Sequence, residues 1–299
     1  MDAEQVKKLC LSLMKADSED EVITILQDAG YWEDGGVWRF YGDNGNNFST
    51  IGNQMSSPDA ALIEKIVNSV DARLMNECLI RGINPEGPDA PKTLREAVAR
   101  FFDFAVDPSG GRAGLIKEWP ASKRREIARG ITLTATGAIA NDGNPCFSIS
   151  DNGEGQTPEM MPRTFLSLTT EENKIRIPFV QGKFNMGGTG VLKFCGHHNL
   201  QLILSRRNPE IFKGNPSYYS ETQWGFTIVR RENPIGGRRS SIYTYLAPLG
   251  AEAAPGKGGV LRFSADSMPI FPEKSNPYFR HSEWGTLIKL YDSKTTGKI

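Results

Sequence analysis

The spacing of apolar side chains predicts helices before about residue 130 and mainly strands after it. Apolar residues three and four positions apart are typical of a helix, whereas short apolar runs bounded by turn residues are typical of a strand. The predicted helices are a leader with Val6, Leu9, Leu13 and Met14 on one face, then residues 20–29, 59–80, 93–104 and 122–129. The predicted strands are residues 131–140, 145–150, 200–205, 225–230, 242–246, 260–263 and 286–291.

The order of these elements predicts an α+β fold, a two-layer sandwich of a mostly antiparallel sheet covered by helices, because hairpin-length turns join most later strands. The longest helix starts at Ser57-Pro58 and stops at Gly82. Residues 1–48 form a helical leader followed by an aromatic and glycine-rich segment, and residues 49–299 form the main domain. Within it, the Pro/Gly-rich stretch at about 82–130 is interpreted as an insertion.

Composition narrows the possible functions. The chain has 35 Lys plus Arg against 35 Asp plus Glu, so a general electrostatic attraction to nucleic acid or to an acidic membrane is not expected. The four cysteines and three histidines lack the spacing of a structural zinc site. The chain also lacks a signal peptide and an apolar run long enough to span a membrane, which predicts a cytoplasmic protein with no membrane partner.

Three polar residues share one edge of the predicted helix 59–80. At about 100° per residue, Glu64, Asn68 and Asp71 fall within an arc of roughly 60°. A solvated helix face is the simpler interpretation. A carboxylate and an amide one turn apart can also hold a hydrated cation and orient a water molecule.

Two further segments carry candidate chemistry. Asp151 follows a predicted strand and begins the run Asp-Asn-Gly-Glu-Gly, which is either a simple turn or a strand end that another molecule can approach. A helix capped by Thr157, with Pro158 first, is predicted directly after it. Gly182, Gly187, Gly188 and Gly190 lie before a short apolar run, so they are either flexible glycine or a phosphate-binding helix start. The polar segment 169–178 before them has the composition of a mobile cover.

In this order the segments resemble the ATP-binding domain of the GHKL superfamily, also called the Bergerat fold, which includes gyrase B subunits, large heat-shock chaperones, MutL and MORC proteins and sensor histidine kinases. The resemblance lies in four motifs and covers about residues 49–291. These are EKIVNSVDA (64–72), DNGEG (151–155), GKFNMGGTG (182–190) and WGTLIKLYD (284–292).

The resemblance implies a role for each matching residue. Glu64 would be the general base that orients the attacking water, Asn68 the ligand of magnesium (Mg2+), and Asp71 a water-mediated phosphate contact. Asp151 would accept from the adenine amino group of ATP, with Gly153 and Gly155 giving the base room and Thr286 supporting the water network. The phosphates would be wrapped by the glycine-rich segment, namely Gly182, Lys183, Gly187, Gly188, Thr189 and Gly190.

The resemblance also implies a magnesium-dependent ATPase, slow in isolation, whose ATP state orders a lid over residues 169–186 and promotes a homodimer or binding of a protein partner. Such a module would belong to a larger DNA-related or defence system. Two departures stand out: Gln156 replaces an apolar residue against the base, and the chain stops directly after the Gly-Thr strand, before the domain that usually supplies a phosphate-contacting lysine. Either the chain is the ATPase module of a longer protein, or Lys183 or Lys193 supplies that contact, or hydrolysis is slow.

A rival hypothesis starts from three arginine pairs at predicted strand ends. Arg206-Arg207, Arg230-Arg231 and Arg238-Arg239 could form a basic rim that binds DNA, although solvated hairpin ends explain them as well. The chain would then be a nucleotide-responsive scaffold without appreciable turnover. It would present this rim, or its aromatic N-terminal segment, to a partner.

Overall fold

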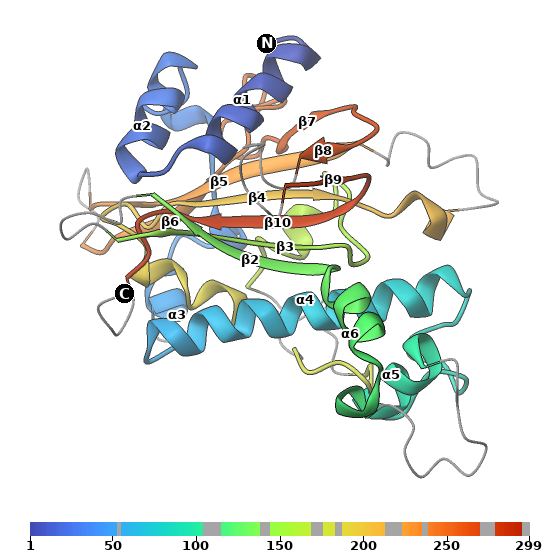
Figure 1. Ribbon diagram of the computed structural model, residues 1–299. Coiled ribbons are helices and arrows are strands. Elements are labelled where there is room, and N and C mark those ends of the chain that lie inside the picture. Colours follow the sequence, from blue (N-terminus) through green and yellow to red (C-terminus); the bar gives the residue numbers. More distant parts are fainter. Residues whose placement is uncertain are drawn as a thin grey trace.

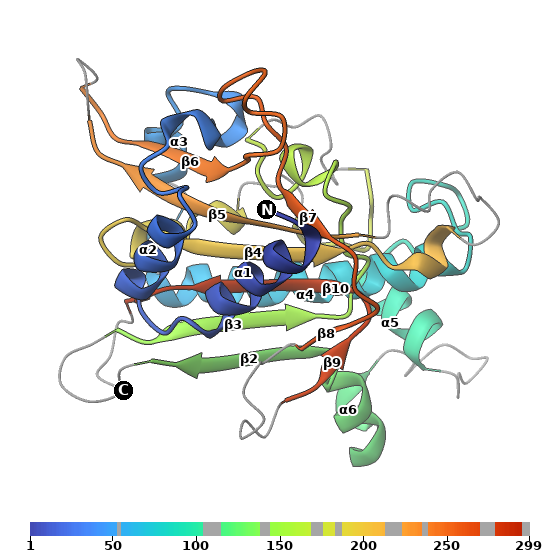
Figure 2. The same ribbon diagram turned by 90° about the horizontal axis from the view of Figure 1, so that it is seen from above.

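The computed structural model describes residues 1–52, 55–103, 115–137, 144–168, 176–182, 187–212, 223–234, 239–269 and 279–294. A large sheet crosses the molecule, with helices on both of its faces (Figures 1 and 2). The described residues form six α-helices: α1 (Ala3–Lys15), α2 (Glu19–Asp28), α3 (Phe48–Gly52), α4 (Pro58–Ile80), α5 (Leu94–Phe102) and α6 (Ala121–Ala128).

The sheet has the strand order β1-β6-β5-β4-β10-β3-β2, with β7 paired to β5, and each of these pairs is antiparallel. Its strands are β1 (Trp38–Phe40), β2 (Ile131–Thr136), β3 (Cys146–Asp151), β4 (Gln201–Arg206), β5 (Trp224–Glu232), β6 (Ile242–Leu246), β7 (Leu261–Phe263) and β10 (Gly285–Leu290). A small separate hairpin joins β8 (Met268–Pro269) to β9 (His281–Ser282). The predicted α+β class with a mostly antiparallel sheet is therefore confirmed.

The two faces of the sheet bury different helices. Alternate residues of a strand point to opposite faces, so Leu202, Leu204 and Leu287 pack with α1 and α2 in one apolar cluster. Ile149 and Leu290 belong to a cluster on the other face, which receives Ala61 of α4. In Figure 1, α1 and α2 lie above the sheet and α4 runs beneath it. Since β1 also pairs with β6, the leader and the aromatic segment are part of the main body of the fold.

The start and end of α4 match the sequence signals. The Ser57 hydroxyl accepts from the Ala60 N–H at 3.2 Å and caps the helix. Gly82, at φ 69°, turns the chain just after it, in the left-handed region that glycine enters without strain. Both predicted boundaries of the longest helix are thus confirmed.

The helix predicted after Asp151 is wrong. The Thr157 hydroxyl does accept from the Met160 N–H at 3.3 Å, but the chain then forms only a single 3₁₀ turn, Met161–Arg163. Pro162 explains the difference, because it lacks the N–H that an α-helix starting at Pro158 would need there. The remaining short 3₁₀ turns are Gly35–Val37, Tyr41–Asp43, Ile116–Glu118, Gly187–Thr189, Leu192–Phe194 and Pro209–Phe212.

Candidate functional site

Asp151 is a buried carboxylate at the end of β3, facing α4. Its Oδ2 accepts from the Ser69 hydroxyl of α4 at 2.9 Å, and its Oδ1 accepts from the Gly153 N–H at 2.9 Å. Burial raises the pKa of Asp151 to about 6, against the lowering effect of these two hydrogen bonds and of the nearby Arg73 charge. The site therefore contains an acceptor that is ionised at neutral pH and held in a fixed orientation.

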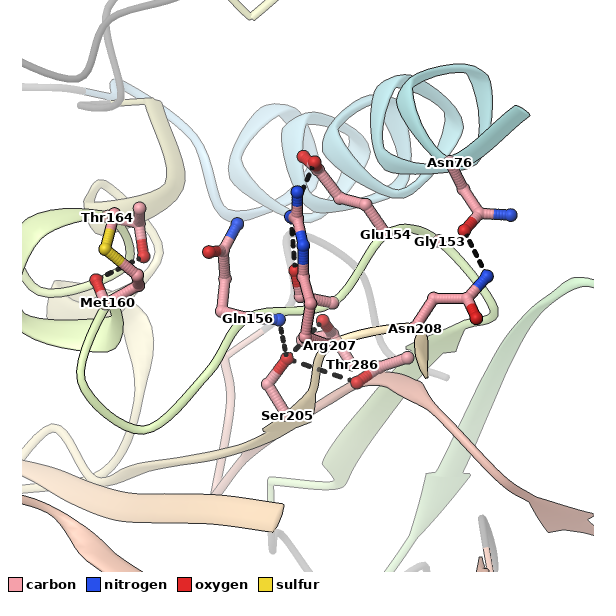
Figure 3. Close-up of polar contacts among 12 residues, drawn as sticks. Asn76, Gly153, Glu154, Gln156, Met160, Thr164, Ser205, Arg207, Asn208 and Thr286 are labelled. Carbon is pink, nitrogen blue, oxygen red and sulfur yellow. Dashed lines mark hydrogen bonds and ion pairs between the residues drawn. The ribbon is translucent and has the colours of Figure 1, made fainter. Parts of the chain in front are cut away.

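A row of hydroxyl groups continues from Asp151 across the sheet. Thr286 of β10 lies directly opposite Asp151, and Ser205 of β4 lies opposite Thr286, so the three side chains share one face. The Ser205 and Thr286 oxygens are 2.9 Å apart, and Ser205 also accepts from the Gln156 N–H at 2.9 Å (Figure 3). This network fixes the position of the loop that carries Gln156.

Two glycines allow the loop after β3 to pass between α4 and β4. A Cβ on Gly153 would lie 2.5 Å from the Ala72 Cβ, and one on Gly155 would lie 1.8 Å from the Arg206 carbonyl oxygen. Gly155 also has φ 61°. Both positions require glycine because of close backbone approach, in addition to any room they leave for a ligand.

A buried ion pair and an amide pair hold the same loop from the other side. Glu154 and Arg207 are 2.8 Å apart and both are largely buried, and the Asn208 side chain donates to the Asn76 oxygen of α4 at 2.6 Å. Figure 3 shows these contacts bridging the loop, the end of β4 and α4. The loop after β3 is therefore fixed before any ligand binds.

The polar edge of α4 holds the glycine-rich segment by its backbone. The Asp71 carboxylate is buried and accepts from the Gln181 N–H at 2.9 and 3.0 Å and from the Gly182 N–H at 2.6 Å. Asp71 thus anchors the start of this segment, while its expected water-mediated phosphate contacts stay a prediction. A Cβ on Gly182 would lie 2.8 Å from the Asn68 Oδ1, so Asn68 is packed against this anchored backbone.

The later glycines reach the same place on α4. A Cβ on Gly188, in the 3₁₀ turn Gly187–Thr189, would lie 3.7 Å from the Asn68 Nδ2 and 3.6 Å from the Lys65 Nζ. Thr189 and Gly190 are buried behind it. Lys183 lies outside the described residues. The structure therefore brings Asn68 of α4 against both ends of the glycine-rich segment.

Lys65 and Glu64 precede Asn68 by one turn. Lys65 is buried, and burial lowers its pKa to about 8, although electrostatic interactions with Cys195 and with Glu64 act in the opposite direction. Glu64 is half-buried on the same turn. Lys193, a predicted phosphate contact, instead donates to the Gly52 carbonyl at 2.8 Å.

The donor set suits magnesium only in the presence of a phosphate ligand. Within the described ranges no three His, Cys, Asp or Glu side chains gather as a metal centre. Asn68 offers one oxygen beside the glycine backbone, and Mg2+ commonly takes one or two protein oxygens with phosphates and water completing its shell. The residues present fit that mode of binding.

The region interpreted as an insertion supports the site from outside. Phe101 of α5 packs edge-on against Phe179, and Ile177 and Val180 join the same apolar cluster with the end of α4. These residues belong to the predicted lid, so its described part, 176–182, is anchored and not an exposed cover. Residues 169–175 and 183–186 lie outside the described residues, and the lid stays a prediction there.

The arginines of the proposed rim are engaged within the chain. Arg206 donates to three backbone carbonyls, those of Ala265, Asp266 and Glu283. Arg231 donates to the His197 carbonyl at 2.6 Å. These contacts and the Arg207 ion pair occupy guanidinium N–H groups within the chain, although only Arg207 is paired with a carboxylate. Arg238 lies outside the described residues, and Arg239 is exposed next to it.

The aromatic N-terminal segment also packs within the chain. The Arg230 guanidinium lies 3.6 Å from the Trp38 ring centroid and 4.7 Å from that of Trp32. Trp38 and Tyr41 are buried. The aromatic rings of Trp38 and Tyr41 are therefore part of the core, whereas Phe40 of the same segment is 46% exposed.

Among the described helices, none is both long enough and apolar enough to cross a bilayer.

Ser69, Ser205 and Lys65 are the site residues that motif reasoning missed. Ser69 and Lys65 lie inside the motif at 64–72, and the 3.6-residue period already places them together, one turn apart. Only their burial against the sheet distinguishes them from ordinary helix residues.

Comparison with protein-family models and with curated proteins found no match.

Proposed function

We propose that this chain binds ATP with magnesium in the manner of a GHKL domain, hydrolyses it slowly and uses the bound state as a switch for association. The observation that carries the proposal is that residues from separate segments of the chain meet beside α4. Asp151, Asn68, Gly182 and Gly188 come from three separate segments, and all of them lie along one side of α4.

The base would bind at the Asp151 end. An adenine amino group needs one acceptor, and the ionised Asp151 carboxylate supplies it while Ser69 holds the carboxylate in place. The Ser205–Thr286 pair lies on the same face of the sheet and would hydrogen-bond a water molecule beside the base. Gln156, whose backbone is fixed by Ser205, would lie near the base edge.

The phosphates would bind one to two turns toward the start of α4. The Asn68 oxygen would hold Mg2+, whose charge would neutralise the phosphates when it is bound. The backbone N–H groups of residues 187–190 would donate to phosphate oxygens, as glycine-rich turns do at anion sites. Gly188 leaves that space open because it has no side chain.

Glu64 would accept a proton from the water that attacks the terminal phosphate. It lies one helical turn before Asn68, on the same polar edge, which is the spacing needed to face the same phosphate. The γ-phosphorus–oxygen bond to ADP breaks as the water oxygen bonds to phosphorus, and the products are ADP and inorganic phosphate. A scaffold without turnover would need no such base.

Replacing Glu64 separates binding from hydrolysis. The Glu64→Ala variant should bind a non-hydrolysable ATP analogue with magnesium as the parent does, while phosphate release falls by about 10²-fold or more, the usual contribution of a general base. Calorimetry and a phosphate-release assay measure the two properties. Glu77→Ala is the matched control, because Glu77 lies on the same helix and pairs with Arg81 near the surface.

The outcomes discriminate between the two functions. Equal turnover by the parent and Glu64→Ala would remove Glu64 from its role. Binding without measurable phosphate release in the parent favours the rival scaffold. DNA binding that weakens as salt increases would favour the arginine rim, whereas its absence excludes that rim.

A further inference from the structure

Lys65 is a largely buried cation for which the described part of the chain supplies no hydrogen-bond or ion-pair partner. The residue is 6% exposed, and within the described residues neither a hydrogen bond nor an ion pair reaches its ammonium group. A buried charge without a partner is costly, so proteins rarely keep one unless a ligand or a function uses it. Lys289 offers a contrast, because its equally buried ammonium donates to the Met14 carbonyl and to Asp17, each at 3.0 Å.

The position of Lys65 shows what could use the charge. Its Nζ lies 3.6 Å from where a Gly188 side chain would begin, and the Asn68 Nδ2 lies 3.7 Å from the same point. The ammonium therefore lies under the glycine-rich turn, next to the predicted magnesium ligand. Lys193 cannot take this place while its Nζ is bonded to the Gly52 carbonyl.

We propose that Lys65 is a phosphate-contacting residue, which donates from within α4 to the β- or γ-phosphate oxygens of the bound nucleotide. This inference rests on the proposed function and deepens it, because it names a cation within the chain's own helix that would contact the phosphates. The unpartnered ammonium gains a charge-assisted hydrogen bond, and the phosphates gain a fixed positive charge beside the glycine backbone.

The proposal predicts a graded loss of affinity in Lys65→Met. Methionine keeps most of the length and volume of lysine and removes the charge. The variant should bind the magnesium complex of a non-hydrolysable ATP analogue about tenfold to a hundredfold more weakly, bind ADP with a smaller loss, and bind adenosine unchanged. Lys65→Arg, which keeps the charge, should retain most of the preference for the triphosphate.

Thermal unfolding separates this role from a structural one. Without ligand, Lys65→Met should melt at or above the temperature of the parent because a buried unpaired charge is gone, whereas its stabilisation by the ATP analogue should shrink. A lysine with only a structural role would leave the stabilisation by the ATP analogue unchanged, whatever the variant did to the melting temperature of the ligand-free protein. Lys8→Met is the matched control, because Lys8 is exposed on α1, across the sheet from α4, and the same exchange there should not change the nucleotide preference.

Each result decides between the proposals. Parent protein that binds none of the three ligands overturns the proposed function and this inference together. Parent protein that binds them, with Lys65→Met keeping the full preference for the triphosphate, overturns this inference alone. Equal weakening for adenosine and for the triphosphate also overturns it, because the effect would then not concern the phosphates.

Discussion

Asp151 is the residue proposed to bind the base, and the dependence of base binding on pH tests this role. Burial raises its pKa to about 6, so the acceptor is ionised at pH 7.5 and largely neutral at pH 5. Both oxygens of Asp151 already accept one hydrogen bond, and protonation turns one of them into a hydroxyl, which leaves fewer lone pairs to accept from an adenine amino group. Base binding should therefore weaken as the pH falls through 6.

Adenosine is the right probe because it lacks phosphates that titrate in the same range. Its affinity for the parent should fall about tenfold between pH 7.5 and pH 5, one unit below the pKa. The Asp151→Asn variant should bind it weakly at both pH values, with no change between them. A parent whose affinity stays constant over this range would contradict the assignment of Asp151.

The raised pKa of Asp151 also determines how the stability of the folded protein changes with pH. A carboxyl whose pKa is higher when folded than its ordinary value of 3.8 favours the folded state in its protonated form. That contribution is complete below pH 3.8 and is lost as the pH rises through about 6. At neutral pH the ionised Asp151 thus costs stability in the ligand-free protein, as a binding residue often does.

The helix α4 connects every part of the candidate site, and sequence pattern predicted it well. Its cap at Ser57, its stop at Gly82 and its polar edge follow from local signals, and they appear in the structure where expected. The contact between Ser69 and Asp151 could not be predicted in the same way, because it joins residues 82 positions apart. The strand β1 was missed because only Trp38–Phe40 pair, within a glycine-rich and aromatic stretch.

A substitution at Gly182 tests the packing of the glycine-rich segment against α4. In Gly182→Ala the new methyl group would lie 2.8 Å from the Asn68 Oδ1, so Asn68 or the segment must move. We expect a loss of about 1–3 kcal/mol in the free energy of unfolding and at least tenfold weaker magnesium-dependent binding. Urea unfolding and calorimetry measure the two effects.

Gly35→Ala is the control for this substitution. A Cβ at Gly35 meets no atom within 4 Å, so the variant should keep the stability and the nucleotide affinity of the parent within error. If Gly182→Ala binds nucleotide as tightly as Gly35→Ala, the Asn68 oxygen is not held by this backbone in the way described.

The whole molecule is more integrated than the division at residue 48 suggested. The buried carboxylate of Glu19, in α2, accepts from the His197, His198 and Leu200 N–H groups, just after the glycine-rich segment. Lys289 of β10 reaches Asp17, between α1 and α2. The spacing of apolar residues predicted the leader helices but not the sheet face they cover, because the pattern of an amphipathic helix does not say which surface it meets.

The zero net charge of the chain fits a phosphate site of this kind. A phosphate ligand need not be drawn by a broad positive surface if a buried lysine, an amide oxygen with magnesium and a glycine backbone hold it locally. The arginines that suggested a wider basic rim are mostly bonded within the chain, to backbone carbonyls, to Glu154 or against Trp32 and Trp38. Nucleotide binding at one side of α4 is therefore the central claim.

Calorimetric titration of a non-hydrolysable ATP analogue with magnesium tests that claim most directly. The parent protein should bind about one equivalent, Asp151→Asn should bind at least tenfold more weakly, and Asp43→Asn should bind as the parent does. Asp43 is a surface partner of Arg39 with φ 51°, a conformation that asparagine tolerates, so it controls for the exchange itself. No heat of binding in the parent, or equal affinity in the parent and Asp151→Asn, would contradict the proposed function.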